Sequence, residues 1–207
     1  MRAPAIAGFL VLGLLGGPLH AFDTSFGGQI GLAQPQSDLA AGKWLTGRGG
    51  ASAGLYGLID LGNSHALRAR ADATFIRPGT INLIDGGGGT QLYAENARTR
   101  LLIAGLDYNY FILQHAFEGP YVIMGLGYAW ASFTGARIVP GGLDAPPADW
   151  PARQSAQSLQ YALGMGWRFS PHLGGEFRFT QGAFRDVGVP YTMVKSPILN
   201  LGLTLDF

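Results

Sequence analysis

The last nine residues of the chain, from Leu199 to Phe207, alternate strictly between two kinds of side chain. Leu or Phe occupies every second position, and the positions between them hold the polar or small residues Asn200, Gly202, Thr204 and Asp206. A period of two predicts a β-strand with one apolar face, because successive side chains of a strand point to opposite sides. The final residue is aromatic, whereas terminal residues of soluble domains are usually frayed. The alternation therefore indicates a strand that is held firmly in a sheet.

This C-terminal pattern resembles the assembly signal of Gram-negative outer-membrane β-barrels. The polar, glycine and two hydrophobic positions of that signal correspond to Asn200, Gly202, Leu205 and Phe207. The sequence departs from the pattern at Leu205, where the family often carries an aromatic residue. The resemblance implies that the barrel assembly machinery binds this strand. The alternative is an ordinary terminal strand of a soluble β-sandwich.

The composition is low in charge and rich in glycine. Charged residues make up 13% of the chain, against a usual share of about 25%. A barrel in lipid tolerates this shortage because its outer belt faces hydrocarbon. The chain has no cysteine, which excludes disulfides, a thiol nucleophile and a lipid-modified cysteine.

The first 21 residues have the three parts of a secretory signal peptide. Arg2 gives a positive start, residues 5–17 form an apolar core, and residues 18–21 provide a cleavage site before Phe22. The alternatives are a buried helix or an uncleaved anchor, which the short apolar run with its glycines and proline disfavours. Residues 22–207 then form one domain with 13 basic and 13 acidic residues. This balance gives no reason to expect a nucleic-acid partner.

Apolar alternation recurs along the whole mature chain and predicts eight strands. After the signal peptide no segment is long and apolar enough for a spanning helix, so a membrane protein of this sequence must be a closed antiparallel up-and-down β-barrel. Each segment is long enough for a tilted span of about 9–11 residues. The predicted strands are residues 24–33, 48–60, 66–77, 97–111, 120–134, 155–169, 173–184 and 195–207.

The predicted connections alternate in length, which is typical of outer-membrane barrels with short periplasmic turns and longer extracellular loops. The short ones are residues 61–65, 114–119 and 170–172, the long ones are residues 35–47, 78–96 and 135–153, and residues 186–194 are intermediate. The alternative is a secreted lipocalin-like barrel, which keeps its apolar faces inside. Low charge and the C-terminal pattern favour the membrane barrel.

Aromatic residues gather near both predicted ends of the strands. At the short-turn end they include Tyr108, Tyr110 and Tyr121, and at the loop end Tyr128 and Trp130. Two girdles of rings at the two membrane interfaces are expected of such a barrel.

The polar face of the strands carries charges of both signs. An eight-stranded barrel has an interior just wide enough for side chains to fill, and unpaired charges there would be costly. We therefore expect an interior ion-pair network, with inward glycines of residues 120–134 and 155–169 making room for it. The alternative is a narrow water-filled channel. The candidate network residues are Arg68, Arg70, Asp72, Asp107, Arg168, Glu176 and Arg178.

Few residues suggest chemistry. The mature chain has three histidines, His65, His115 and His172, and all fall in or beside predicted short turns, where polar residues usually bond the local backbone. The glycine run after Asp85 lacks the helix and lysine of a phosphate loop and the carboxylates of a calcium loop. We expect no catalytic residue, metal or cofactor. Exposed loop residues such as Asp144, Asp149 and Trp150 could contact an external ligand.

The signal peptide, eight strands and C-terminal pattern together resemble the class of small OmpA-like, opacity-protein-like and OmpW-like barrels. The resemblance implies a location in the Gram-negative outer membrane, with membrane lipid and lipopolysaccharide as partners. It implies a structural or surface-contact role through the extracellular loops. A small pore or conduit for hydrophobic solutes is the alternative, and a lipid A-modifying enzyme is a third reading. Fold does not choose among these functions.

Overall fold

The computed structural model describes residues 23–36, 49–85, 91–113, 118–134, 137–140, 153–185, 193–195 and 197–207. The predicted signal peptide, His115, the four glycines that follow Asp85, and the candidate ligand contacts Asp144, Asp149 and Trp150 lie outside these residues. The expectations for those segments stay predictions.

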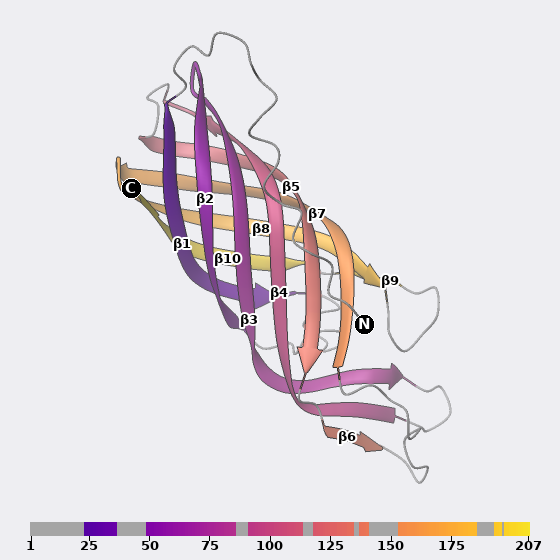
Figure 1. Cartoon of the computed structure of the whole chain (residues 1–207). Coiled ribbons are helices and arrows are strands. Elements are labelled where there is room, and N and C mark those ends of the chain that lie inside the picture. The colour runs from indigo at the N-terminus through magenta and orange to yellow at the C-terminus, as the bar shows by residue number, and fades with distance from the viewer. Residues whose placement is uncertain are drawn as a thin grey trace, which may run out of the picture.

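Eight antiparallel strands close into a barrel, as predicted (Figure 1). Each strand pairs with the next along the chain, and β10 closes the barrel on β1 through a register that runs from Gly27↔Asp206 to Pro35↔Ile198. In the described part of the chain, no helix has the length and hydrophobicity needed to cross a membrane. The barrel strands are β1 (Thr24–Pro35), β2 (Gly50–Gly62), β3 (His65–Asp85), β4 (Gln91–Phe111), β5 (Gly119–Thr134), β7 (Arg153–Ser170), β8 (Leu173–Arg185) and β10 (Ile198–Asp206).

Part of the predicted loop sequence is strand, which corrects the boundaries of the sequence analysis. β3 and β4 continue pairing as far as Asp85↔Gln91, well inside the predicted loop 78–96. Two short strands were also not predicted. β6 (Arg137–Pro140) lies inside the predicted loop 135–153 and pairs with β4, and β9 (Met193–Lys195) spans the end of the predicted loop 186–194 and pairs with β8. The Pro78-Gly79 pair looks like the start of a loop, but the ladder accommodates it by shifting register between Ile76 and Gly79.

The apolar face of the barrel is the outer one. Large apolar side chains on every barrel strand point away from the lumen, and examples such as Leu32 and Leu159 are 67% and 71% exposed. The opposite face carries buried polar and charged residues. A soluble barrel would have the reverse arrangement, with its apolar face inside. A continuous exposed apolar surface of this size instead marks contact with lipid or protein. We call this outward surface the apolar belt.

The connections between β2 and β3, β4 and β5, and β7 and β8 define the short-turn end of the barrel, and the other end is the loop end. The β2–β3 connection shows why such a turn can be short. Gly62, Asn63 and Ser64 all have positive φ, of 80°, 51° and 74°. Glycine and asparagine reach this region at low cost, and Asp60 Oδ1 accepts a hydrogen bond of 2.8 Å from the Gly62 N–H.

Leu126 lies in the middle of β5 on the apolar belt and is 64% exposed. We expect Leu126→Arg to lower the free energy of unfolding in lipid vesicles by about 2–4 kcal/mol, because it places a charge near the middle of the hydrocarbon. Urea titration of the refolded barrel in vesicles measures this. The control is Gln157→Arg, at an exposed outward position near the loop end, with an expected loss below about 1 kcal/mol. Equal losses would contradict the placement of the belt in lipid.

Candidate functional site in the barrel lumen

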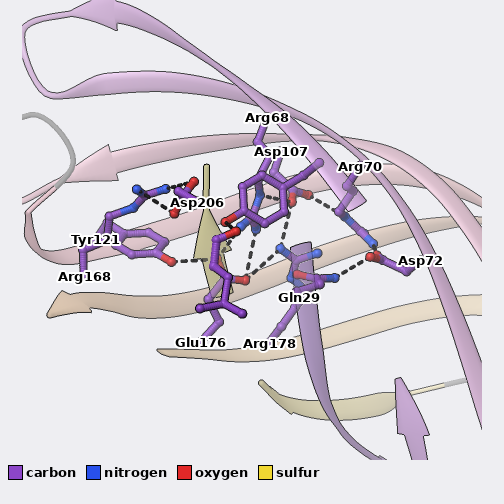
Figure 2. A network of polar contacts seen from close by, with 12 residues as sticks. Gln29, Arg68, Arg70, Asp72, Asp107, Tyr121, Arg168, Glu176, Arg178 and Asp206 are labelled. Carbon is purple, nitrogen blue, oxygen red and sulfur yellow. Dashed lines mark hydrogen bonds and ion pairs between the residues drawn. The ribbon is translucent and has the colours of Figure 1, made fainter. Parts of the chain in front are cut away.

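The centre of the lumen is organised around one carboxylate, that of Asp107 on β4. Its side chain is fully buried, and it accepts hydrogen bonds from three arginines. Asp107 Oδ2 lies 3.0 Å from Arg68 Nη2 and 2.8 Å from Arg178 Nη2, while Oδ1 lies 3.1 Å from Arg70 Nε. Figure 2 shows these side chains converging from β3, β4 and β8. One carboxylate thus joins β4 to its neighbour β3 and to β8, which is far away in sequence.

Two further carboxylates complete the charge balance. Glu176 on β8 accepts hydrogen bonds from Arg68, including Nη2 to Oε2 at 3.1 Å, and its Oε2 lies 3.3 Å from Arg178 Nη2. Asp72 on β3 pairs with Arg70. Together with Asp107 they give three carboxylates against three guanidinium groups. We call these residues the ion-pair network: Arg68, Arg70, Asp72, Asp107, Glu176 and Arg178.

The network is neutral and almost closed to solvent, since each of its members is at most 8% exposed. Desolvating one such charge costs several kcal/mol, and only close partners with good geometry offset that cost. Mutual pairing within a low-dielectric interior also strengthens each hydrogen bond. The arrangement is therefore stable as a set, and removal of one member leaves another charge buried without compensation.

Arg168 occupies a separate position in the lumen. It forms its ion pair with Asp206 on β10, with Nη1 to Oδ2 at 2.8 Å and Nη2 to Oδ1 at 3.0 Å. The sequence predicted that Arg168 belongs to one network with the other candidates. In the structure its carboxylate partner is Asp206 on β10, outside the ion-pair network. This second pair links β7 to the strand that closes the barrel.

Three polar residues join the charged ones and were not among the sequence candidates. Tyr121 Oη donates a hydrogen bond of 2.6 Å to Glu176 Oε1, the Tyr56 ring lies 5.2 Å from Arg68 Cζ, and Gln29 Nε2 donates to Asp72. Tyr121 was expected in an interfacial girdle, but it is buried in the lumen at 2% exposure. The alternation along this strand could have predicted the inward position of Tyr121, because Val122 next to it faces outward.

Inward glycines provide the space that these large side chains fill. A Cβ atom on Gly125 would collide with the Asp107 carboxylate, and one on Gly166 would collide with the Tyr121 ring. A Cβ on Gly54 would likewise meet Asp72. An eight-stranded lumen is only wide enough for side chains. A large side chain on one strand therefore requires a residue without one at the position that it faces.

Among the described residues, the lumen is filled on the short-turn side of the network, and a small cavity lies beside it. A buried cluster of Leu58, Ala66, Phe111, Tyr121 and Ile123 packs inside the barrel. The cavity has a volume of about 40 Å³ and is lined by Arg70, Asp72 and Arg178 with neighbours such as Thr180 and Asn200. At about 10–15 Å³ per water molecule it holds on the order of three waters. Organic ligands need pockets of about 300 Å³ or more.

The described histidines are engaged in local contacts. His65 Nδ1 hydrogen-bonds to Tyr108 Oη, and the His65 ring also lies 5.2 Å from that of Tyr110. His172 Nδ1 lies 3.1 Å from the carbonyl oxygen of Asp206. Within the described ranges, no group of three or more His, Cys, Asp or Glu side chains could hold a metal ion.

The residues that match the C-terminal assembly signal lie on both faces of β10. Leu205 and Phe207 point outward at 45% and 82% exposure, while Gly202 pairs with Gly31 and Asn200 with Ala33 on β1. The Phe207 N–H donates a hydrogen bond of 2.8 Å to the Phe26 carbonyl. The terminal residues thus take part in the seam that closes the barrel.

The sequence matches no protein-family model and no curated protein. Solved structures resemble the barrel. Ail, the attachment invasion locus protein of Yersinia pestis in complex with the heparin analogue sucrose octasulfate, superposes with a TM-score of 0.51 at 12% identity, covering 90% of this chain and 99% of Ail. Neisserial surface protein A gives 0.50 at 13% identity, covering 89% and 97%. The fold is that of small eight-stranded outer-membrane barrels. At these identities the likeness establishes the fold alone.

Replacing Asp107 by Asn should destabilise the barrel severely, because it leaves three buried arginines with two carboxylates. We expect the free energy of unfolding to fall by about 3–5 kcal/mol, measured by urea titration in lipid vesicles. Asp23→Asn, at an exposed carboxylate, is the matched control and should change stability by less than about 0.5 kcal/mol. If the two variants behave alike, the ion-pair network contributes nothing to stability.

Gly125→Ala tests the space requirement separately from charge. The new methyl group would press on the Asp107 carboxylate, and we expect a loss of about 1–3 kcal/mol from overpacking. In the control Gly28→Ala, the nearest atom would lie 3.6 Å from the new Cβ, so stability should be unchanged or slightly higher. A neutral Gly125→Ala variant would show that the Asp107 side chain has room to move.

Proposed function

We propose that this protein is an integral outer-membrane barrel that does not conduct solutes and that acts through its outer surface and extracellular loops. Its role is structural or one of surface contact. The apolar belt supports insertion in lipid, since exposed apolar surface on this scale is unstable in water. The barrel fold that it shares with Ail and Neisserial surface protein A supports an outer-membrane location, reached after export through the predicted signal peptide of residues 1–21.

The single observation that carries this proposal is the neutral ion-pair network across the lumen. A conducting pore needs a continuous path of water, and the described lumen has buried ion pairs and a cavity for only a few waters beside them. Opening a path would separate charges that compensate one another at high cost. A closed lumen leaves the two rims and the outer wall as the surfaces available for function.

The same features argue against the enzymatic alternative. Catalysis by a small barrel requires a nucleophile or base beside a space that admits substrate. The described histidines bond a tyrosine and a backbone carbonyl, and the described cavity is too small for a lipid headgroup. We therefore propose a non-enzymatic role.

Single-channel recording of the refolded chain in a planar bilayer tests the proposal. We expect no steady openings from wild-type protein whose insertion is verified by protease protection, because the ion-pair network blocks the lumen. Arg178→Ala removes one arm of the network and serves as the comparison. Steady wild-type openings whose conductance changes in Arg178→Ala would overturn the closed-lumen proposal in favour of a charge-lined pore.

A further inference from the structure

The small cavity beside the ion-pair network is lined by a charged side chain that is only partly bonded. Arg178 on β8 reaches the network through one nitrogen, with Nη2 at 2.8 Å from Asp107 Oδ2 and at 3.3 Å from Glu176 Oε2. Its other terminal nitrogen, Nη1, is buried and has no hydrogen-bond partner among the described residues. The whole side chain is 4% exposed and lines the cavity. A guanidinium nitrogen can only donate hydrogen bonds, so we expect the cavity to hold an acceptor.

The carboxylates that line the cavity already accept hydrogen bonds from the protein. Asp72 accepts one from Gln29 and one from Arg70, on different oxygens. Each oxygen of Glu176 accepts hydrogen bonds from two donors. The charged group that is left without a partner at the cavity is therefore a donor, which favours an anion over a cation as the occupant.

The electrostatic surroundings of Arg178 point the same way. Arg68 and Arg70 both repel its guanidinium group. They also share its carboxylate partners, because Asp107 pairs with all three arginines and Glu176 pairs with Arg68 as well. Arg178 thus receives only part of the negative charge of each partner, and a small anion at Nη1 would complete its compensation.

Uncharged polar groups line the same cavity. Asn200 pairs with Arg178 in the ladder between β8 and β10, and Thr180 is the next inward residue of β8. The amide oxygen of Asn200 has no partner in the described part of the chain, so the amide can turn its N–H groups towards an anion. The hydrogen of the Thr180 hydroxyl can rotate to donate as well.

The size of the cavity restricts the kind of anion. Its volume of about 40 Å³ holds only a few particles of the size of water. A chloride or bromide ion fits this space and leaves room for water. Phosphate and sulfate place four oxygens around a central atom and carry a second charge, so they fit the cavity poorly.

We propose that the cavity binds a small monovalent anion of the size of a halide, held by Arg178 Nη1 with Asn200 and Thr180. This inference goes beyond the proposed function, because it assigns a ligand to the closed lumen. The ion-pair network is neutral before the anion binds, and one more unpaired charge in the lumen would be costly. The anion therefore enters together with a proton.

Asp72 is the carboxylate that accepts this proton. It pairs with Arg70 on its own strand, whereas Asp107 pairs with three arginines. The charged residues of β8 that line the cavity with it are Glu176 and Arg178, and its neighbours on β1 and β2 are the uncharged Gln29 and Gly54. Protonation of Asp72 thus breaks the fewest ion pairs, and binding of the anion should strengthen as the pH falls.

The test uses the full mature chain refolded in detergent micelles in sodium bromide, or in sodium gluconate at equal ionic strength because gluconate is too large for the cavity. We expect resistance to urea to rise with bromide concentration and to saturate, which gives an apparent Kd. Thr180→Val removes a donor from the cavity and should raise that Kd at least about fivefold. The matched control is Thr99→Val, at a buried threonine that does not line the cavity, and its Kd should stay within about twofold of wild type.

Diffraction from crystals grown in sodium bromide locates the ion directly. An anomalous bromide peak within hydrogen-bond distance of Arg178 Nη1 would support the inference. Water at that position, bromide only at the outer surface, equal effects of bromide on wild type and Thr180→Val, or binding that strengthens as the pH rises would each overturn it. A silent bilayer with water in the cavity would leave the proposed function standing, whereas steady wild-type openings with bromide at Arg178 would overturn the proposed function alone.

Discussion

The barrel depends on the compensation of buried charge at Asp107. This carboxylate lies on β4 and accepts hydrogen bonds from arginines on β3 and β8. It therefore also ties β4 to β8, which the backbone ladder connects to β4 only indirectly. A lumen of eight strands excludes bulk water, and each charge inside it must find a partner among the other side chains of the lumen. The glycines of β5 and β7 make this pairing possible, because they leave room for Arg, Asp and Tyr side chains.

The outer wall is shaped by a different constraint, which is that it faces lipid. Because backbone groups of a membrane-spanning chain must bond to one another, closure of β10 on β1 leaves no open edge, and the outward residues are then free to be apolar. Among the described side chains, charge is confined to the lumen and to the two rims. Arg77, Arg98 and Arg100 are exposed at the loop end, where the wall stops being apolar. The packed lumen explains how the barrel stays closed.

Sequence alternation predicted the strands well where a lipid-facing side alternates with a packed lumen. The predicted strand boundaries were wrong at the loop end, where β3 continues to Asp85 and β4 already begins at Gln91. There the ladder of backbone hydrogen bonds extends through Pro78 and Gly79 by shifting register, and such pairing depends on the neighbouring strand rather than on local side chains. The same reasoning explains β6, whose four residues form a strand only because β4 lies beside them.

The sequence by itself determined the period of two, the side of each strand that is apolar, and the set of charged residues on the other side. These are local properties, because they follow from residue types at alternating positions. Only the tertiary structure decided which charges meet, since Arg68 and Glu176 are separated by 108 positions and come together through the closure of the sheet. It also decided that Arg168 pairs with Asp206, that Tyr121 lies inside, and that Arg77 stands beside Arg98 and Arg100 on the outer wall. Register and closure are relations between distant strands, and residue alternation within one strand cannot specify them.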